Sequence, residues 1–478
     1  MRYAAVALDF DGTLAHNGEV PPHVVAGLRR LKATGRTLLL VTGRELPELL
    51  AIFPEIGIFE RVVAENGALL YRPESRETQD LGEPPPPALV ALLRERGVPI
   101  SVGDTIIATV EPYEATALRT IHDLGLEHPV IFNKGAVMIL PPGINKASGL
   151  AVALRELGLS ARNVVAVGDA ENDHALLEAA EYAVAVSNAV ATLQAAADRV
   201  TAAPRGDGVL EVIADLIESD LAHSPPARTR RAIILGRDAN GAAVRIPAAG
   251  VSMLVTGAPR NGKSSFTHRV LERLCAIGYQ TCVLDGRGEY LDFQPAVVFG
   301  TQEVAPDPFD VLTALEKPDL QAVVCLAAVP AGKRPGFFAK LNLELRALRE
   351  KTGRPHWLVI DEAEELLPKD DRRPVEEDGA LAENTLYVTS HPDALARGIA
   401  GRVDIVCARG TAAQEALEAF ARDVSLPPPP EPVRTPGVHE ALVWLRRTGD
   451  APKLITLPPA ASGARPLRSN VGPVLRRA

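Results

Sequence analysis

The sequence is poor in cysteine, in aromatic residues and in long apolar runs. It has four cysteines among 478 residues, and only 4% of the residues are Phe, Trp or Tyr. No two cysteines form a Cys-x-x-Cys pair, so neither a zinc site nor a disulfide framework is supported. The longest apolar stretches have the length of β-strands and fall well short of the roughly 20 residues that a transmembrane helix needs. We therefore expect neither a membrane-spanning protein nor a disulfide-stapled domain.

The charge balance and the N-terminus bear on which partners and which cellular location we expect for the protein. The formal net charge is -9, which argues against an overall basic surface for nucleic-acid binding but does not exclude a local basic channel. The first residues run directly into a polar motif, without the apolar segment of a signal peptide. We expect a cytoplasmic protein without a membrane partner, and nucleic-acid binding has no support from the sequence.

The chain length and the apolar pattern predict two domains. A chain of 478 residues is too long for one ordinary core. Two sections alternate short apolar runs with helix-period segments, as is typical of α/β folds, and a proline-containing break separates them. We place one domain at 1–222, a linker at 223–230 and a second domain at 231–478. Residues 72–142 have an α/β pattern of their own and are predicted to form an inserted cap, since structureless loops of this length are uncommon.

Polar residues follow three apolar runs of the first domain, and a lysine stands at the start of a predicted helix. Asp9 and Asp11 stand in DFDGTL, Thr42 and Gly43 in VTGR, Lys146 in GINKASGL, and Asp169, Asn172 and Asp173 in GDAENDHALL. Open α/β sheets place their sites where such strands end. One carboxylate can attack phosphorus, a neighbouring acid can protonate the leaving oxygen, and further carboxylates suit Mg2+. A threonine hydroxyl, a backbone N–H and a lysine can hold phosphate oxygens.

The order of these motifs resembles the haloacid dehalogenase superfamily, specifically its Cof-type (class IIB) subfamily, over about residues 1–217. The resemblance implies a Rossmann-like core with an inserted α/β cap, and a phosphatase with Asp9 as nucleophile and Asp11 as general acid/base. The implied phosphate contacts are Thr42, Gly43, Lys146 and Asn172, and the implied Mg2+ site comprises Asp9, Asp11 (through its backbone carbonyl), Asp169 and Asp173. The expected substrate is a small phosphomonoester, such as a sugar phosphate or phosphoglycolate.

The second domain contains a predicted phosphate loop. Residues 257–264 read GAPRNGKS and fit G-x-x-x-x-G-K-[ST] between an apolar run and an amphipathic segment. Lys263 can reach the β- and γ-phosphates of ATP, and Ser264 can hold Mg2+. The residues expected to bind the nucleotide are Gly257, Asn261, Gly262, Lys263, Ser264, Ser265 and Asp361. Asp361 and Glu362 end another apolar run, where Glu362 can act as the catalytic base toward water.

Three further segments of the second domain resemble HerA/FtsK-type ATPases over about residues 231–472. They are IILGRDANGAAVRIP before the loop, LDGRGEY after the second strand, and EALVWLRR near the end. The resemblance implies a P-loop NTPase α/β domain that hydrolyses ATP and could form a ring-shaped homo-oligomer. Two alternatives stay open: a nucleic-acid end-processing or translocating protein, and a P-loop module that senses nucleotide and controls the phosphatase.

Overall fold

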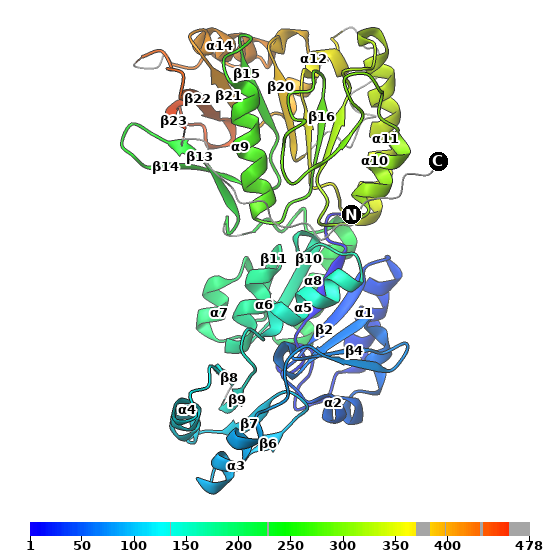
Figure 1. The fold of residues 1–478 in the computed structure, drawn as a ribbon, viewed down its shortest axis with the longest axis vertical. Coiled ribbons are helices and arrows are strands. Elements are labelled where there is room, and N and C mark those ends of the chain that lie inside the picture. Colours follow the sequence, from blue (N-terminus) through cyan, green and yellow to red (C-terminus); the bar gives the residue numbers. More distant parts are fainter. Residues whose placement is uncertain (134, 227–228, 370–382, 397, 431–433, 458–478) are drawn as a thin grey trace. The chain divides into compact units, whose positions relative to one another are not determined.

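The chain folds as two units, each with its own sheet and core (Figure 1). The computed structural model describes residues 1–478 except 134, 227–228, 370–382, 397, 431–433 and 458–478. The units comprise Met1–Arg230 and Arg231–Ala478. Arg230, at the end of the predicted linker, belongs to the first unit, because its Nε donates to Asp198 at 2.8 Å and its Nη1 to the Leu177 carbonyl at 2.9 Å.

The first unit is built on an eight-stranded sheet in the order β12-β11-β10-β1-β2-β3-β4-β5. Its parallel strands are β1 (Ala5–Leu8), β2 (Thr37–Val41), β3 (Arg61–Ala64), β10 (Val164–Gly168), β11 (Tyr182–Ala185) and β12 (Arg199–Val200), and β4 (Leu69–Arg72) and β5 (Glu77–Asp80) form an antiparallel hairpin at one edge. The central strands are buried on both faces, which explains their nearly continuous apolar runs. The α/β architecture predicted for this section is confirmed.

Helices cover both faces of this sheet. On one face α1 (Pro22–Ala33) and α8 (Arg205–Ser219) pack on alternate residues of β1 and β2. On the other face lie α5 (Lys146–Glu156), α6 (His174–Ala179) and α7 (Ala191–Ala196). Since β1 lies between β10 and β2, the carboxyl ends of three parallel strands meet at the middle of the sheet.

A four-stranded antiparallel sheet forms the inserted cap. Its order is β6-β7-β9-β8, with β6 (Ser101–Val102), β7 (Ile107–Val110), β9 (Ala136–Ile139) and β8 (Val130–Asn133), and α3 (Pro87–Glu95) and α4 (Glu114–Asp123) pack on it. The predicted cap range, 72–142, includes residues 77–80, but these residues pair with the core sheet as β5. This strand is polar and exposed (ETQD), so no apolar alternation marked it in the sequence.

The second unit contains an eleven-stranded mixed sheet, in the order β14-β13-β23-β22-β21-β15-β20-β19-β16-β18-β17. The parallel strands are β21 (Ile405–Arg409), β15 (Met253–Gly257), β20 (Thr385–Thr389), β19 (Trp357–Ile360), β16 (Thr281–Asp285), β18 (Ala322–Cys325) and β17 (Val297–Phe299). The antiparallel ones are β14 (Ala243–Pro247), β13 (Ala232–Arg237), β23 (Lys453–Thr456) and β22 (Glu440–Leu445).

The helices of the second unit lie in two apolar clusters. Residues of α9 (Lys263–Ala276) belong to one, and residues of α10 (Pro308–Leu315), α11 (Arg334–Thr352), α12 (Ala363–Leu366), α13 (Ile399–Arg402) and α14 (Ala413–Asp423) belong to the other. Trp357 is fully buried and donates from its ring N–H to the Ala248 carbonyl at 2.8 Å. Within the described part of the chain, no helix combines the length and the apolar character that crossing a membrane requires.

Candidate active site

Three buried carboxylates meet at the carboxyl edge of the first sheet. Asp9 directly follows β1, and Asp169 and Asp173 follow β10, which pairs with β1 in parallel. Each offers an oxygen, and these oxygens lie within 4.8 Å of one another. The parallel pairing of two strands that are far apart in the sequence therefore assembles the acidic cluster.

Lys146 is the cation that this cluster encloses. It begins α5, where the Asn145 side chain caps the helix by accepting from the Ser148 N–H at 3.0 Å. Its Nζ donates to Asp9 Oδ1 and to Asp173 Oδ1, both at 2.6 Å, and the side chain is 1% exposed. Burial lowers the pKa of Lys146, but the two carboxylates outweigh it, so the pKa lies above its ordinary value and the side chain is charged.

The cluster fits a divalent cation. Burial raises the pKa of Asp9 well above its ordinary value, and the negative charge of Asp173 adds to this while Lys146 opposes it. Three acidic side chains share one ammonium in a buried site with oxygen donors, and a divalent cation there would favour the ionised form of Asp9. Such oxygen donors are the ligands that Mg2+ prefers, so Asp9, Asp169 and Asp173 are the residues that would hold it.

Backbone and hydroxyl groups hold the acids in place. Asp169 Oδ1 accepts from the Thr13 hydroxyl at 3.1 Å, and Asp173 Oδ2 accepts from the Asp169 N–H at 2.9 Å. A Cβ on Gly168 would lie 2.6 Å from the Asp173 Cβ, so only glycine permits this approach. Asn188 links the loop after β1 to the cluster, because its Nδ2 donates to the Gly12 carbonyl at 2.9 Å and to Asp169 Oδ2 at 3.4 Å.

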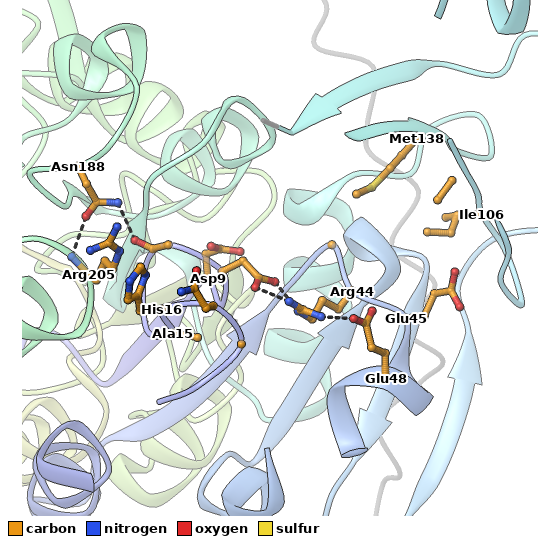
Figure 2. A pocket seen from close by; sticks show the side chains of 16 residues that line it. Asp9, Ala15, His16, Arg44, Glu45, Glu48, Ile106, Met138, Asn188 and Arg205 are labelled. Atoms are coloured by element: carbon orange, nitrogen blue, oxygen red, sulfur yellow. Dashed lines mark hydrogen bonds and ion pairs between the residues drawn. The ribbon is translucent and has the colours of Figure 1, made fainter. Parts of the chain in front are cut away.

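The Asp11 carboxylate stands apart from the cluster and pairs with Arg44. Arg44 Nε donates to Asp11 Oδ2 at 2.6 Å, and Arg44 Nη2 donates to Asp11 Oδ1 at 2.7 Å. Arg44 also pairs with Glu48 of α2 (Leu46–Ile52), as Figure 2 shows. Arg44 belongs to the VTGR motif, but the spacing of this motif does not predict a contact between Arg44 and Asp11.

A cavity of about 490 Å³ opens over these groups. Asp9, Asp11, Gly43 and Arg44 line it from the core, and Ile106, Ala108 and Met138 line it from the cap. In Figure 2, Ile106 and Met138 lie to one side of Asp9, and Asn188 and Arg205 lie to the other. Of the expected phosphate contacts, Gly43 lines the cavity, whereas Thr42, Lys146 and Asn172 are not among its lining residues.

The turn after β3 joins the core to the cap. Glu65 and Asn66 both adopt left-handed backbone conformations, with φ of 51° and 54°. The Glu65 carboxylate accepts from the Thr105 N–H at 3.1 Å and from the Thr105 hydroxyl at 2.9 Å. Asn66 Oδ1 accepts from Asn172 Nδ2 at 2.9 Å, which places Asn172 in a contact between core loops. The sequence predicts no role for Glu65, because its partner Thr105 lies in the cap, far from Glu65 along the chain.

In the second unit, residues 257–263 form a tight loop between β15 and α9. Gly262 has a φ of 75°, a conformation that favours glycine. Lys263 Nζ donates to the Gly257 carbonyl at 3.0 Å and to the hydroxyl of Ser390, which follows β20, at 2.8 Å. Ser264 donates to Glu289, and Ser265 is exposed. Asn261 forms part of the loop beside β21, where its carbonyl accepts from Arg409 Nε at 3.0 Å.

Two acids follow β19 next to this loop. Asp361 is 2% exposed, and its Oδ2 is buried without a hydrogen-bond partner in the described part of the chain. Burial raises the pKa of Asp361 well above its ordinary value, and Glu362 and Asp285 add to the effect. Glu362 has a left-handed backbone with a φ of 48°, and it forms an ion pair with Arg287 Nε at 3.1 Å.

Known proteins match the first unit. The family model described as haloacid dehalogenase-like hydrolase matches residues 6–104 and 116–213. A phosphoglycolate phosphatase from Methanothermobacter thermautotrophicus is 33% identical over 221 residues, which are 44% of this chain and 96% of that protein. One from Haloarcula marismortui is 32% identical over 224 residues, 43% of this chain and 94% of that protein. A solved haloacid dehalogenase-like hydrolase from Bacteroides thetaiotaomicron has a TM-score of 0.40 and 23% identity, over 45% of this chain and 99% of its own.

Proposed function

Because the chain belongs to the haloacid dehalogenase-like hydrolases through its first unit, we propose that this unit is a Mg2+-dependent phosphatase of a small phosphomonoester. One observation carries the proposal: Asp9 lines the cavity, and the same carboxylate is bound to the buried Lys146. A nucleophile needs one oxygen facing the substrate and a fixed orientation for the carboxylate. Asp9 meets both requirements.

In the proposed reaction, the Asp9 oxygen that is not bonded to Lys146 attacks phosphorus, and the bond from phosphorus to the leaving oxygen breaks. Asp11, protonated on one oxygen that is released from Arg44, gives this proton to that leaving oxygen as general acid. Asp11 then takes a proton from a water molecule whose oxygen attacks the aspartyl-phosphate, and the bond between Asp9 and phosphorus breaks. Mg2+ would supply positive charge that offsets the repulsion between these carboxylates and the phosphate.

Phosphoglycolate is the first substrate that we propose. Both relatives compared above are named phosphoglycolate phosphatases. The cap walls the cavity with Ile106, Ala108 and Met138, which favours a small molecule over a polymer end. Arg205 also lines the cavity, so a cationic group is available for a second anionic group of the substrate, and His16 adds a hydrogen-bonding side chain.

The test is phosphate release from a panel of phosphomonoesters that includes phosphoglycolate, with Mg2+ or with chelator. We expect selective, Mg2+-dependent turnover that Asp9→Asn lowers by at least roughly 10³-fold, because an amide is not a nucleophile. Asp80→Asn, an exposed position on β5, is the matched control and keeps wild-type turnover. Equal turnover by the Asp9→Asn and Asp80→Asn variants would exclude Asp9 as the nucleophile.

For the second unit we propose ATP binding and hydrolysis at the loop 257–264. The supporting observation is Lys263, whose Nζ is held in the loop by the Gly257 carbonyl and Ser390. Burial lowers the pKa of Lys263, and the negative charges of Glu362 and Asp361 oppose this effect. Asp361 would face the Mg2+ of a bound nucleotide, and Glu362 would orient the attacking water.

Calorimetry with MgATP tests this second proposal. Lys263→Ala is expected to abolish binding, whereas Lys340→Ala on the exposed side of α11 leaves it intact. Binding without turnover would favour the nucleotide-sensing alternative. Hydrolysis that DNA stimulates, together with a ring-sized homo-oligomer in light scattering, would favour the translocating alternative.

A further inference from the structure

The cavity over Asp9 has two walls of different chemistry. The cap contributes Ile106, Ala108 and Met138, whose side chains carry neither a charge nor a strong hydrogen-bonding group. These residues can exclude water, but they do not distinguish one polar leaving group from another. The lining side chains that can select among phosphomonoesters therefore lie on the core side of the cavity.

Two arginines line the core side, and they differ in what holds them. Arg44 is engaged by both oxygens of Asp11 and by Glu48. The Arg205 guanidinium, by contrast, donates no hydrogen bond and forms no ion pair within the described part of the chain. It lies on the side of Asp9 away from the labelled cap residues (Figure 2). Because an arginine side chain stays charged, this end of the cavity presents a cation that is available to a ligand.

The backbone holds Arg205 at this end of the cavity. Its φ is 51°, a left-handed conformation that costs free energy in a residue other than glycine and that clusters at ligand sites. The Arg205 N–H donates to Asn188 Oδ1 at 2.7 Å, and Asn188 Nδ2 donates to the Gly12 carbonyl. A Cβ on Gly206 would lie 2.6 Å from Val24 Cγ2, so this turn packs closely against α1. The start of α8 is therefore fixed relative to the loop after β1.

We propose that Arg205 determines the substrate specificity of the first unit by binding a carboxylate on the leaving group, an inference that rests on the proposed phosphatase function. The substrate class is a short phosphomonoester that carries a carboxylate. The planar guanidinium can donate two parallel hydrogen bonds to the two carboxylate oxygens. Arg205 and the nucleophile Asp9 line the same cavity of about 490 Å³. The core, and not the apolar cap wall, selects the substrate in this arrangement.

The charges of the cavity favour a carboxylate over a second phosphate. Glu45 and Glu48 also line the cavity, so added negative charge on the substrate is repelled unless a cation pairs with it. One guanidinium balances one negative charge. A carboxylate carries a single charge, whereas a phosphate monoester carries about −1.5 to −2 at pH 7. We therefore expect substrates of the phosphoglycolate type and not bisphosphates.

Steady-state kinetics on the full chain with Mg2+ test this assignment with two matched substrates. Phosphoglycolate carries the carboxylate, and its amide, phosphoglycolamide, has nearly the same shape without the charge. We expect wild type to favour phosphoglycolate at least roughly tenfold in kcat/KM. Arg205→Gln should lower kcat/KM for phosphoglycolate by roughly 10- to 100-fold, mostly through KM, because two charge-assisted hydrogen bonds are lost. It should leave the value for the amide within about threefold.

Two further variants complete the test. Arg29→Gln, at an exposed position of α1, is the control and should keep both wild-type values. Arg205→Gly suits the left-handed backbone of this position and removes the guanidinium. It should show the same selective loss as Arg205→Gln and melt close to wild type.

The outcomes separate the inference from the proposed function. Equal kcat/KM of wild type for the two substrates, or an equal loss for both in Arg205→Gly, overturns the specificity assignment and leaves the phosphatase in place. A substrate ratio that Met138→Ala changes and Arg205→Gln does not would assign selection to the cap and overturn it as well. Faster turnover of ethylene glycol bisphosphate than of phosphoglycolate overturns the carboxylate class. Hydrolysis of no phosphomonoester overturns the proposed function and the inference with it.

Discussion

Arg44 should position Asp11, the proposed general acid/base, and replacing Arg44 with lysine tests this role. Its guanidinium holds both oxygens of Asp11 at 2.6 and 2.7 Å. Lysine keeps the positive charge but cannot match two carboxylate oxygens with a planar fork. Arg44→Lys should therefore leave the charge of the site nearly unchanged and let the Asp11 carboxylate rotate.

The size of the effect follows from the geometry and the exposure. A hydrogen bond to a charged group contributes about 1.5–3 kcal/mol when it is well protected from water. The Asp11 side chain is 36% exposed and that of Arg44 is 22% exposed, so solvent screening reduces this value. We expect a loss of about 1–2 kcal/mol in the chemical step, which corresponds to a roughly five- to thirtyfold fall in kcat.

Steady-state kinetics with phosphoglycolate, measured across pH, provide the assay. A positioning role predicts a lower kcat with little change in KM, and a pH profile whose acid/base limb shifts. Arg30→Lys, at an exposed position of α1, is the control and should match wild type. The reasoning is refuted if Arg44→Lys retains kcat within about twofold, or if the whole loss appears in KM, because Arg44 would then bind substrate instead.

Three further predictions concern stability. Lys146→Met leaves two buried carboxylates without their cation and should lower the free energy of unfolding by about 3–5 kcal/mol in urea without Mg2+. Added Mg2+ should restore part of this stability. An unchanged urea midpoint would contradict the ion-pair geometry. Burial raises the pKa of the Glu65 carboxyl above its ordinary value of 4.5. The stabilising contribution of Glu65 is therefore present below pH 4.5 and is lost as the pH rises through the pKa of the folded state. Glu65→Gln can still accept from Thr105 and should flatten this pH dependence of stability in thermal melts from pH 4 to 8. Trp357→Phe removes the bond to the Ala248 carbonyl and should destabilise the second unit by about 2–3 kcal/mol in urea titrations, and a loss below about 0.5 kcal/mol would argue against that bond.

The sequence predicted most strands of both sheets because their two faces are buried. The short apolar runs of both sections form strands such as 164–168, 281–285 and 385–389, since a strand covered by helices on both sides carries mostly apolar residues on both faces. The polar strand β5 was missed because its pairing with β4 depends on backbone hydrogen bonds, which leave no apolar pattern. The inserted cap was predicted from its own α/β pattern and from its length, since structureless loops that long are uncommon.

The sequence by itself determined the chemistry available to this protein. It placed carboxylates and a glycine-rich loop at strand ends and a lysine at the start of a helix, and the parallel strands of an α/β fold bring their carboxyl ends to one edge of the sheet. Only the tertiary structure decided which of them meet. The pairing of β1 with β10 brings Asp9 to Asp169, and the VTGR turn brings Arg44 to Asp11. Such contacts join residues far apart along the chain, and strand order and side-chain packing select them, whereas a sequence pattern records only what lies nearby.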